Sequence, residues 1–232
     1  MLISLLTSGA PIQIILIELL LMFPMVLLAL SFHEVAHGYV AWKCGDPTAY
    51  NMGRLTLNPK KHLDLAGTLC MLVFGFGWAK PVPINTRYFR NPKRGMALSA
   101  IAGPAANLLL GLIFSLLSGI CLYLNDAGYL LSVTYWAFQL FYIGAQLNFL
   151  FMVFNLLPIP PFDGSRIALA FLPTKLYFAV MRYERQIMIG ILLALFAMSY
   201  FFNISPFGWV AGLLSNVITG SVYDLLCLIF SL

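Results

Sequence analysis

The 232 residues of this chain are 61% hydrophobic and only 9% charged, with a mean hydropathy of +0.91. These values exclude an ordinary soluble domain, and the length allows several membrane spans but no sizeable additional soluble domain. The formal net charge of +5 does not indicate nucleic-acid binding, because no soluble module offers exposed basic and aromatic surface. We predict an all-α polytopic membrane protein, embedded in the lipid bilayer as one domain over residues 1–232.

The distribution of the basic residues orients the predicted protein. All thirteen Lys and Arg residues fall into two blocks, at 43–94 and 166–185, whereas the connections at 125–129 and 203–207 contain none. Cytoplasmic loops of membrane proteins carry an excess of Lys and Arg. We therefore expect a multi-pass protein of the cell membrane, with both basic blocks in the cytoplasm and the N-terminus outside.

The first predicted span, at residues 12–40, carries the sequence HEVAH near its cytoplasmic end. In a helix, His33 and His37 lie one turn apart on the same face, so both imidazoles can bind one Zn²⁺ while Glu34 lies beside them as a general base. Glu18, the other acid of this span, lies about 24 Å away at 1.5 Å per residue. Because ionisable residues inside a span are functional by default, the motif predicts a zinc site in or at the edge of the bilayer.

Two short segments precede the second span. Residues 65–76 are apolar but short for a span, and we expect a re-entrant, interfacial or β-hairpin element there. Residues 80–85, KPVPIN, contain two prolines and are interpreted as an extended edge, to which an unwound substrate adds as a strand. His62, in the loop before them, is interpreted as a solvated residue rather than a metal ligand.

The second and third predicted spans, at residues 95–124 and 131–157, each contain a polar motif. Asn107 lies among small residues in AGPAAN, and we interpret it either as an interhelical hydrogen-bonding residue or as part of the site lining. The third span ends in NLLPIPPFDG, whose three prolines cannot continue a helix. Broken backbone at membrane depth is tolerated only where it is buried in protein or lines a polar cavity.

Asp163 follows this break at the cytoplasmic end of the third span, at about the depth expected for HEVAH. Two distant segments thus present His33, His37 and Asp163, the three protein ligands of a catalytic zinc whose fourth position is left for water. Two simpler interpretations remain open: Asp163 as a helix N-cap, and Asn155 as a cap of the broken helix.

The last two predicted spans, at residues 187–202 and 209–232, bring the number of spans to about five. With the expected orientation of the first three, the last span returns toward the cytoplasm. Neither span carries a motif, and the sequence gives no indication of the oligomeric state.

The chain resembles the site-2 protease family of intramembrane zinc metalloproteases, in its small prokaryotic type without PDZ or CBS domains. The motifs that carry the resemblance, between about residues 30 and 170, are HEVAHGYVAWKCGDPTA, GRLTLNP, KPVPIN, AGPAAN and NLLPIPPFDG. The resemblance implies that His33, His37 and Asp163 bind the zinc and that Glu34 is catalytic. It also implies that Asn155 helps to hold the substrate or the oxyanion.

These observations predict an intramembrane zinc endopeptidase with one zinc ion per chain. Its expected substrate is a transmembrane or membrane-tethered protein, cut in or near a transmembrane segment close to the cytoplasmic face, after Glu34 has activated a water molecule. One alternative is a membrane metal-ion transporter with the same ligands, although no internal repeat is visible. Another is a non-catalytic relative that binds membrane proteins, although binding alone does not require a general base.

Overall fold

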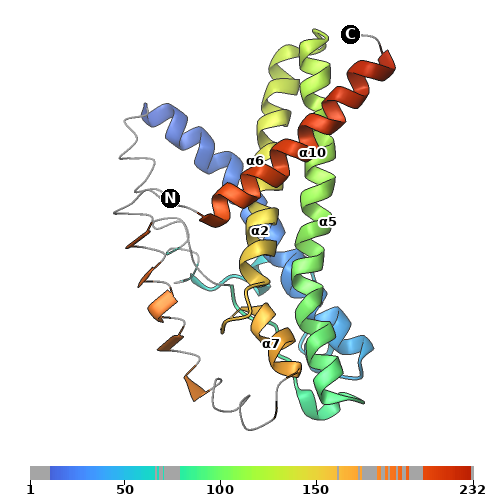
Figure 1. Ribbon diagram of the computed structural model, residues 1–232, viewed down its shortest axis with the longest axis vertical. Coiled ribbons are helices and arrows are strands. Elements are labelled where there is room, and N and C mark those ends of the chain that lie inside the picture. The colour runs from blue at the N-terminus through green and yellow to red at the C-terminus, as the bar shows by residue number, and fades with distance from the viewer. Residues whose placement is uncertain are drawn as a thin grey trace.

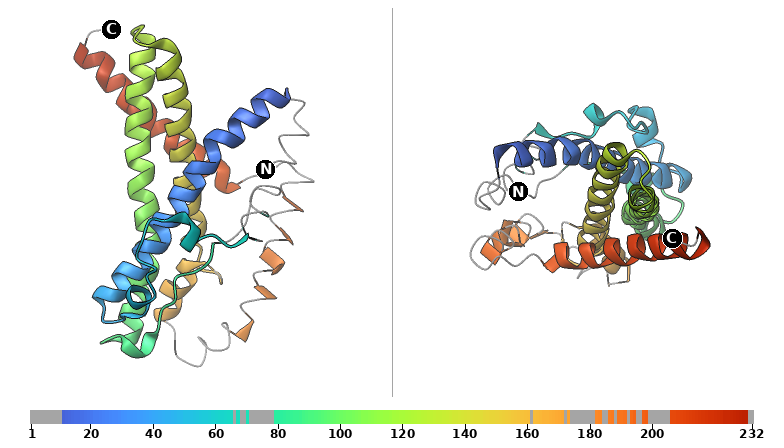
Figure 2. Two further views of the ribbon diagram at one scale, coloured as in Figure 1. Left: turned by 180° about the vertical axis from the view of Figure 1, so that it is seen from behind. Right: turned by 90° about the horizontal axis from the view of Figure 1, so that it is seen from above.

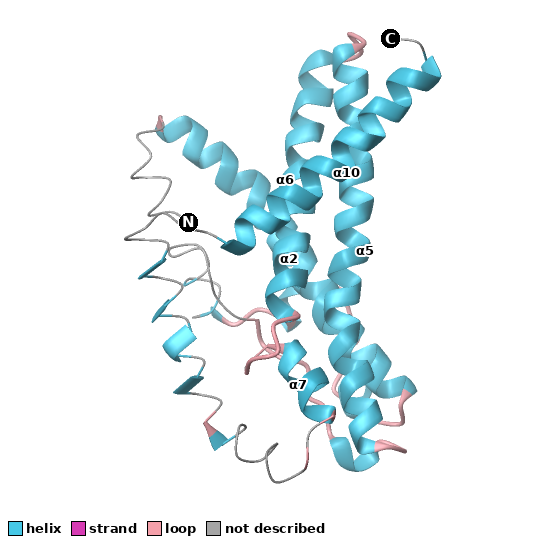
Figure 3. Cartoon of the chain, in the orientation of Figure 1, coloured by secondary structure: helices cyan, strands magenta, loops and turns pink. Residues whose placement is uncertain are grey.

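A computed structural model describes residues 11–65, 79–160, 162–171 and 206–230, together with isolated residues between these ranges. Within these ranges the regular secondary structure is entirely helical (Figure 3). The long helices are α2 (Ile12–Lys43), α5 (Pro92–Asp126), α6 (Leu131–Asn155) and α10 (Pro206–Phe230), and the short ones are α3 (Thr48–Asn51), η1 (Pro59–Lys61), η2 (Thr86–Tyr88) and α7 (Asp163–Ala170).

Four of the described helices are long and apolar enough to cross a membrane: Ile12–Lys43, Pro92–Asp126, Leu131–Asn155 and Gly208–Phe230. This agrees with the predicted helical, polytopic fold. Half of the predicted span at 187–202 and most of the predicted element at 65–76 lie outside the described residues. The number of five spans and the re-entrant or hairpin element therefore stay predictions.

Helices α5 and α6 form an antiparallel pair that lies between α2 and α10 (Figures 1 and 2). The turn that joins the pair contains two left-handed residues, Gly128 with a φ of 81° and Leu130 with a φ of 44°. Seen from above, α2 covers one side of the pair and α10 the other (Figure 2). The pair is thus the central layer of the molecule.

A small apolar core lies where the four long helices meet. Close approach of α5 and α6 depends on glycine, since a Cβ on Gly111 would lie 2.7 Å from the Phe149 ring and a Cβ on Gly144 would lie 2.9 Å from Phe114. Small residues allow such approach between membrane helices, whose packing is driven by close contact rather than by exclusion of water. The buried core residues are Met25, Leu110, Phe114, Ala145, Phe149 and Ala211.

Helix α10 runs along α5 in the same direction. Ser118 Oγ and Thr219 Oγ1 lie 2.8 Å apart. Closer to the C-terminal ends of both helices, Tyr223 Oη donates to Asp126 Oδ2 at 2.8 Å. The C-terminal end of α10 therefore lies near the α5–α6 turn (Figure 1). The sequence predicts that the last span runs opposite to the second, and this relative direction is wrong; the direction of α10 with respect to the cytoplasm stays a prediction. No Lys or Arg follows Arg185, so the charge pattern could not orient this helix.

Candidate active site

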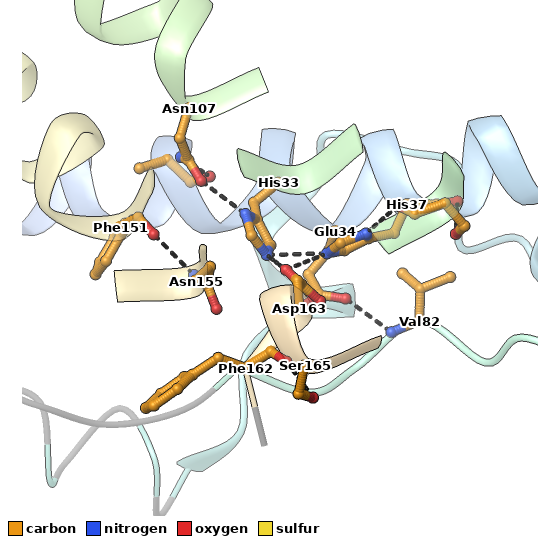
Figure 4. A network of polar contacts seen from close by, with 12 residues as sticks. His33, Glu34, His37, Val82, Asn107, Phe151, Asn155, Phe162, Asp163 and Ser165 are labelled. Carbon is orange, nitrogen blue, oxygen red and sulfur yellow. Dashed lines mark hydrogen bonds and ion pairs between the residues drawn. The ribbon is translucent and has the colours of Figure 1, made fainter. Parts of the chain in front are cut away.

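The first two site residues lie on one face of α2, which continues unbroken through HEVAH to Lys43. The Nε2 atoms of His33 and His37 are 2.9 Å apart, and their rings meet edge to face with centroids 4.5 Å apart. Both residues are buried, each with 7% of its surface exposed. The one-turn spacing predicted from the sequence thus brings two imidazole nitrogens to one point (Figure 4).

The third site residue returns to this point after the proline-rich break. Helix α6 ends at Asn155 and α7 begins at Asp163. The Asp163 carboxylate oxygen Oδ2 lies 3.1 Å from Nε2 of His33 and 3.1 Å from Nε2 of His37. The structure therefore brings together the three residues that the sequence proposes as metal ligands (Figure 4).

Hydrogen bonds on the far side of each ring fix the histidine tautomers. His37 Nδ1 lies 2.7 Å from the Ser99 backbone carbonyl, and His33 Nδ1 lies 2.6 Å from Asn107 Oδ1. A carbonyl oxygen only accepts, so each Nδ1 must carry the proton and donate it. In neutral imidazoles both Nε2 atoms then present lone pairs, and these lone pairs face Asp163.

The resulting group of atoms suits a metal ion. Two nitrogen lone pairs and one carboxylate oxygen converge, and among the described residues the buried Oδ2 of Asp163 receives no hydrogen bond. Their mutual distances of 2.9–3.1 Å are close to the value of about 3.3 Å that tetrahedral bonds of about 2.0 Å would give. Two imidazoles and one carboxylate are the donor set of a catalytic zinc with an open fourth position.

The charge of the site also favours a cation. Burial raises the pKa of the Asp163 carboxyl, whereas hydrogen bonds and positive charge from protonated His33 and His37 lower it, and the net pKa lies below the usual range. With neutral rings, a metal ion on the two Nε2 lone pairs would supply that positive charge instead. A buried negative charge is costly unless it is paired or bound to a metal.

Glu34 is held by the chain segment that precedes α5. Its Oε2 accepts a hydrogen bond of 2.8 Å from the Val82 backbone N–H (Figure 4). This contact differs from the expectation that residues 80–85 pair with substrate along their edge. Pro81 and Pro83 have no N–H, and the amide between them already serves Glu34. The Val82 amide is thus a partner of the candidate base, and the addition of a substrate strand along the rest of this edge stays a prediction.

The same segment is anchored at both ends by buried polar side chains. Arg54 Nη2 donates to the Lys80 carbonyl at 2.8 Å, and the Asn85 N–H donates to Asp46 Oδ2 at 2.6 Å. The Lys80 N–H donates to the backbone carbonyl of His62 at 2.8 Å. His62 is only 1% exposed, so its interpretation as a solvated loop residue is wrong. It helps to position the segment that holds Glu34.

Asn155 lies beside the metal ligands, at the last position of α6 (Figure 4). Its Nδ2 donates to the Phe151 carbonyl of the preceding turn at 3.0 Å. This bond returns to a carbonyl inside α6, whereas the end of the helix is capped by backbone N–H groups, such as that of Leu156, which donates to the Met152 carbonyl. An amide nitrogen carries two hydrogens, so a second one can still be offered to a reacting group.

Sequence reasoning missed most of what α5 contributes. Ser99, Gly103 and Asn107 are four residues apart and share one face of this helix. A Cβ on Gly103 would lie 2.4 Å from His37 Nε2 and 2.6 Å from His33 Cε1, so only glycine leaves room for both rings. The available signal was a small or polar residue at every fourth position of an otherwise apolar span.

Comparisons with known proteins agree with this site. Residues 131–198, which include Asn155 and Asp163, match Peptidase family M50. The chain is 48% identical over 143 residues to "Putative zinc metalloprotease YwhC" of Bacillus subtilis, a match that covers 61% of this chain and 64% of that protein. No solved structure matches the chain.

Two more distant relatives carry names of the same kind. "Putative zinc metalloprotease Rip2" of Mycolicibacterium smegmatis is 34% identical over 144 residues, 60% of this chain and 52% of the relative. "Putative zinc metalloprotease MJ0611" of Methanocaldococcus jannaschii is 31% identical over 138 residues, 59% of this chain and 62% of the relative. The chain thus spans between about half and two thirds of the length of these relatives. The resemblance predicted from the motifs is confirmed: part of the chain matches the model of Peptidase family M50, and the chain is similar to proteins that carry the name of a zinc metalloprotease.

Proposed function

We propose that this protein is an intramembrane zinc endopeptidase, which hydrolyses a peptide bond in or near a transmembrane segment of a membrane protein, close to the cytoplasmic face. The observation that carries the proposal is the convergence of Asp163 with His33 and His37 beside Glu34. The two histidines and Glu34 lie on a helix that is apolar enough to span a membrane. The names of the relatives support zinc as the metal, and one set of ligands implies one ion per chain.

Each polar residue of the site has a distinct task in this proposal. A bound zinc ion lowers the pKa of a water molecule and polarises the carbonyl that is attacked. His33, His37 and Asp163 hold the ion and leave one side of it open to the reactants. Glu34 removes the proton from the attacking water and transfers it to the leaving amine.

Asn155 is proposed to stabilise the charge that develops on the substrate carbonyl oxygen. One hydrogen of its Nδ2 is used by the Phe151 carbonyl, which fixes the amide plane and leaves the second hydrogen for the oxyanion. A donor that is already oriented costs no reorganisation during the reaction, and removing one such donor typically costs about 3 kcal/mol of transition-state stabilisation.

The proposed substrate is a transmembrane or membrane-tethered segment that unwinds before it is cut. Helical amides are hidden by internal hydrogen bonds, so the scissile bond must leave the helix to reach the site. Residues with low helix propensity, such as glycine, are therefore expected near the cleavage point, because each lowers the cost of local unwinding by about 1 kcal/mol.

The experiment that tests the proposal compares wild type, Glu34→Gln and Glu18→Gln in liposomes with a model transmembrane substrate. Cleavage and bound zinc are measured for all three proteins. Glu34→Gln keeps an oxygen that accepts from Val82 but lacks the base, so zinc should remain near one per chain while cleavage is lost. Glu18→Gln makes the same change on an exposed part of the same helix and should cleave normally.

Other outcomes identify the rival functions. Zinc-dependent cleavage that survives in Glu34→Gln contradicts the role of Glu34 as general base. Zinc uptake into liposomes that is equal in wild type and Glu34→Gln, without cleavage by either, favours the metal transporter. Absence of bound zinc in the wild type contradicts the metal site itself.

A further inference from the structure

A line of buried amides leads from α6 through α5 to the zinc site. Asn148 Nδ2 donates to the Gly144 backbone carbonyl at 2.8 Å, and Asn148 Oδ1 accepts from Asn107 Nδ2 at 2.9 Å. Asn107 Oδ1 in turn accepts from His33 Nδ1 at 2.6 Å (Figure 4). Both asparagines are 0% exposed, so water does not offer an alternative partner to either amide.

Each link of this line fixes the direction of the next. The Gly144 carbonyl can only accept, so it holds the nitrogen of the Asn148 amide and turns its oxygen toward Asn107. That oxygen requires a donor, so Asn107 presents Nδ2 to it and Oδ1 to His33. The same Nδ2 also donates to the Ala29 backbone carbonyl at 3.4 Å, which is longer than its bond of 2.9 Å to Asn148. If either amide were reversed, its oxygen would face another oxygen, that of Gly144 or of the second asparagine. No solvent is present in this buried site to satisfy the unpaired groups.

The two zinc-binding histidines differ in how their tautomers are set. His37 donates to a backbone carbonyl, that of Ser99, whose direction the helix fixes. His33 depends on a side-chain amide that can present either oxygen or nitrogen. With nitrogen toward the ring, Nδ1 of His33 would have to accept and the proton would move to Nε2, the atom that zinc requires without a proton.

We propose that Asn148 is a positioning residue of the zinc site, which sets the tautomer of His33 through Asn107. Asn148 makes no direct hydrogen bond to His33, His37 or Asp163, so its effect on them passes through the amide of Asn107. The inference rests on the proposed function only in taking zinc as the metal. It gives Asn107 both of the roles that the sequence left open: an interhelical hydrogen bond and a contact with the site.

The test uses two substitutions of Asn148 that differ in whether the new side chain can accept the hydrogen bond from Asn107. Asn148→Leu has nearly the same branched shape but neither donates nor accepts. Asn148→Asp, protonated in this buried position, keeps an oxygen that accepts from Asn107 and an O–H that donates to the Gly144 carbonyl. A matched control, Thr219→Val, removes the hydrogen bond to Ser118, another buried interhelical bond, on the side of α5 that packs against α10.

Two measurements are made on each full-length protein in detergent. Zinc affinity is determined by competition with a chromophoric chelator, and the ¹⁵N chemical shifts of the His33 ring report its tautomer in the metal-free protein. Asn148→Leu should bind zinc about tenfold more weakly, which is the lower end of the effect of residues that orient metal ligands. In this variant the His33 ring should carry its proton on Nε2. Asn148→Asp and Thr219→Val should both stay close to wild type.

Two outcomes would overturn the inference. One is an unchanged zinc affinity and an unchanged Nδ1–H tautomer of His33 in Asn148→Leu. The other is an equal loss of zinc affinity in Asn148→Leu and Thr219→Val with the tautomer unchanged, which would reduce Asn148 to a packing residue. A wild type that binds zinc but cuts no membrane substrate contradicts the proposed function and leaves this inference intact, because neither measurement involves cleavage.

Discussion

The carboxylate of Glu34 has two oxygens, and the hydrogen bond from Val82 occupies one of them. The other oxygen remains to take a proton from water. Both the orientation of the proposed base and its distance from the metal ligands therefore depend on a backbone N–H that no inspection of side-chain types would select. At this scale the proposed catalyst is a pair, a carboxylate and the amide that holds it.

Replacing Val82 with proline removes that N–H and should slow cleavage without affecting zinc binding. A hydrogen bond to a charged group contributes about 1.5–3 kcal/mol, so kcat should fall about 10- to 100-fold. Val82→Ala keeps the N–H and is the matched control. The measurement is kcat on a peptide substrate, with bound zinc quantified. Equal losses in the two variants would show that the Val82 side chain matters and the hydrogen bond does not.

Gly103 sets the space available to the two histidine rings. In Gly103→Ala the new methyl group would lie 2.4 Å from His37 Nε2, which backbone packing between α2 and α5 cannot relieve without moving a ring. We expect zinc affinity to fall at least about tenfold, in line with other changes around metal ligands. Titration with a competing chelator measures this.

The control for this substitution is Gly220→Ala on α10, where a Cβ meets no atom within 4 Å. That change adds the same methyl group where it contacts no other atom, and it should leave zinc affinity unaltered. If both alanine variants bind zinc as wild type does, the α2–α5 packing is looser than the structure has it.

At the scale of elements, the break between α6 and α7 returns the chain to the site. Gly164 makes the return possible, since a Cβ on it would lie 2.3 Å from the Leu156 carbonyl oxygen and 2.5 Å from that of Leu157. The first turn of α7 thus rests directly on the backbone that leaves α6. Asp163 is fixed by this backbone contact as well as by its own side chain.

Gly164→Ala should therefore displace Asp163 and weaken zinc binding, although all three ligands remain in the chain. Asp163→Ala, which removes one ligand outright, gives the scale for a complete loss of that contact. We expect Gly164→Ala to lie between wild type and Asp163→Ala when zinc affinity is measured by chelator competition. A wild-type affinity would mean that α7 can shift away from Leu156 without moving the carboxylate.

The sequence predicted the residues that converge at this site better than the groups that support them. His33 and His37 follow from helical spacing, and Asp163 follows from a proline break at a matching depth. Ser99 and Asn148 escaped notice because a single serine or asparagine in an apolar span has many uses. The Val82 contact depends on where a loop closes on α2, which neither periodicity nor charge encodes.

At the scale of the whole molecule, the described helices are apolar on the outside as well as inside. Large exposed hydrophobic side chains lie on each of the four candidate spans, as expected for a protein surrounded by lipid. Examples are Leu16 on α2, Leu109 on α5, Val133 on α6 and Leu228 on α10. In the candidate site, His33, Glu34 and His37 are instead buried among these helices.

The direction of α10 makes a prediction about membrane topology. Because Asp126 pairs with Tyr223, the C-terminal end of α10 should share one side of the membrane with the α5–α6 turn. Single cysteines at Tyr129 and Ile229, both exposed, should react together with a membrane-impermeant thiol reagent. The background is a protein without its four native cysteines.

Arg87, in the basic region expected in the cytoplasm, is the opposite control for this labelling. A cysteine there should react in intact cells only after the membrane is permeabilised. Labelling of Ile229 together with Arg87, and not with Tyr129, would restore the inward direction predicted from the sequence.

Asp163 reaches the histidines from a part of the chain far from α2, so an ion bound by all three fastens α7 to α2. Ligand binding to the folded state alone adds about 2.7 kcal/mol to its stability when the free ligand exceeds its dissociation constant a hundredfold. The ion proposed for catalysis is therefore also a removable cross-link. Chelation would withdraw the reactive centre and, in the same step, remove the link between α7 and α2, while α7 keeps its backbone contact with the end of α6.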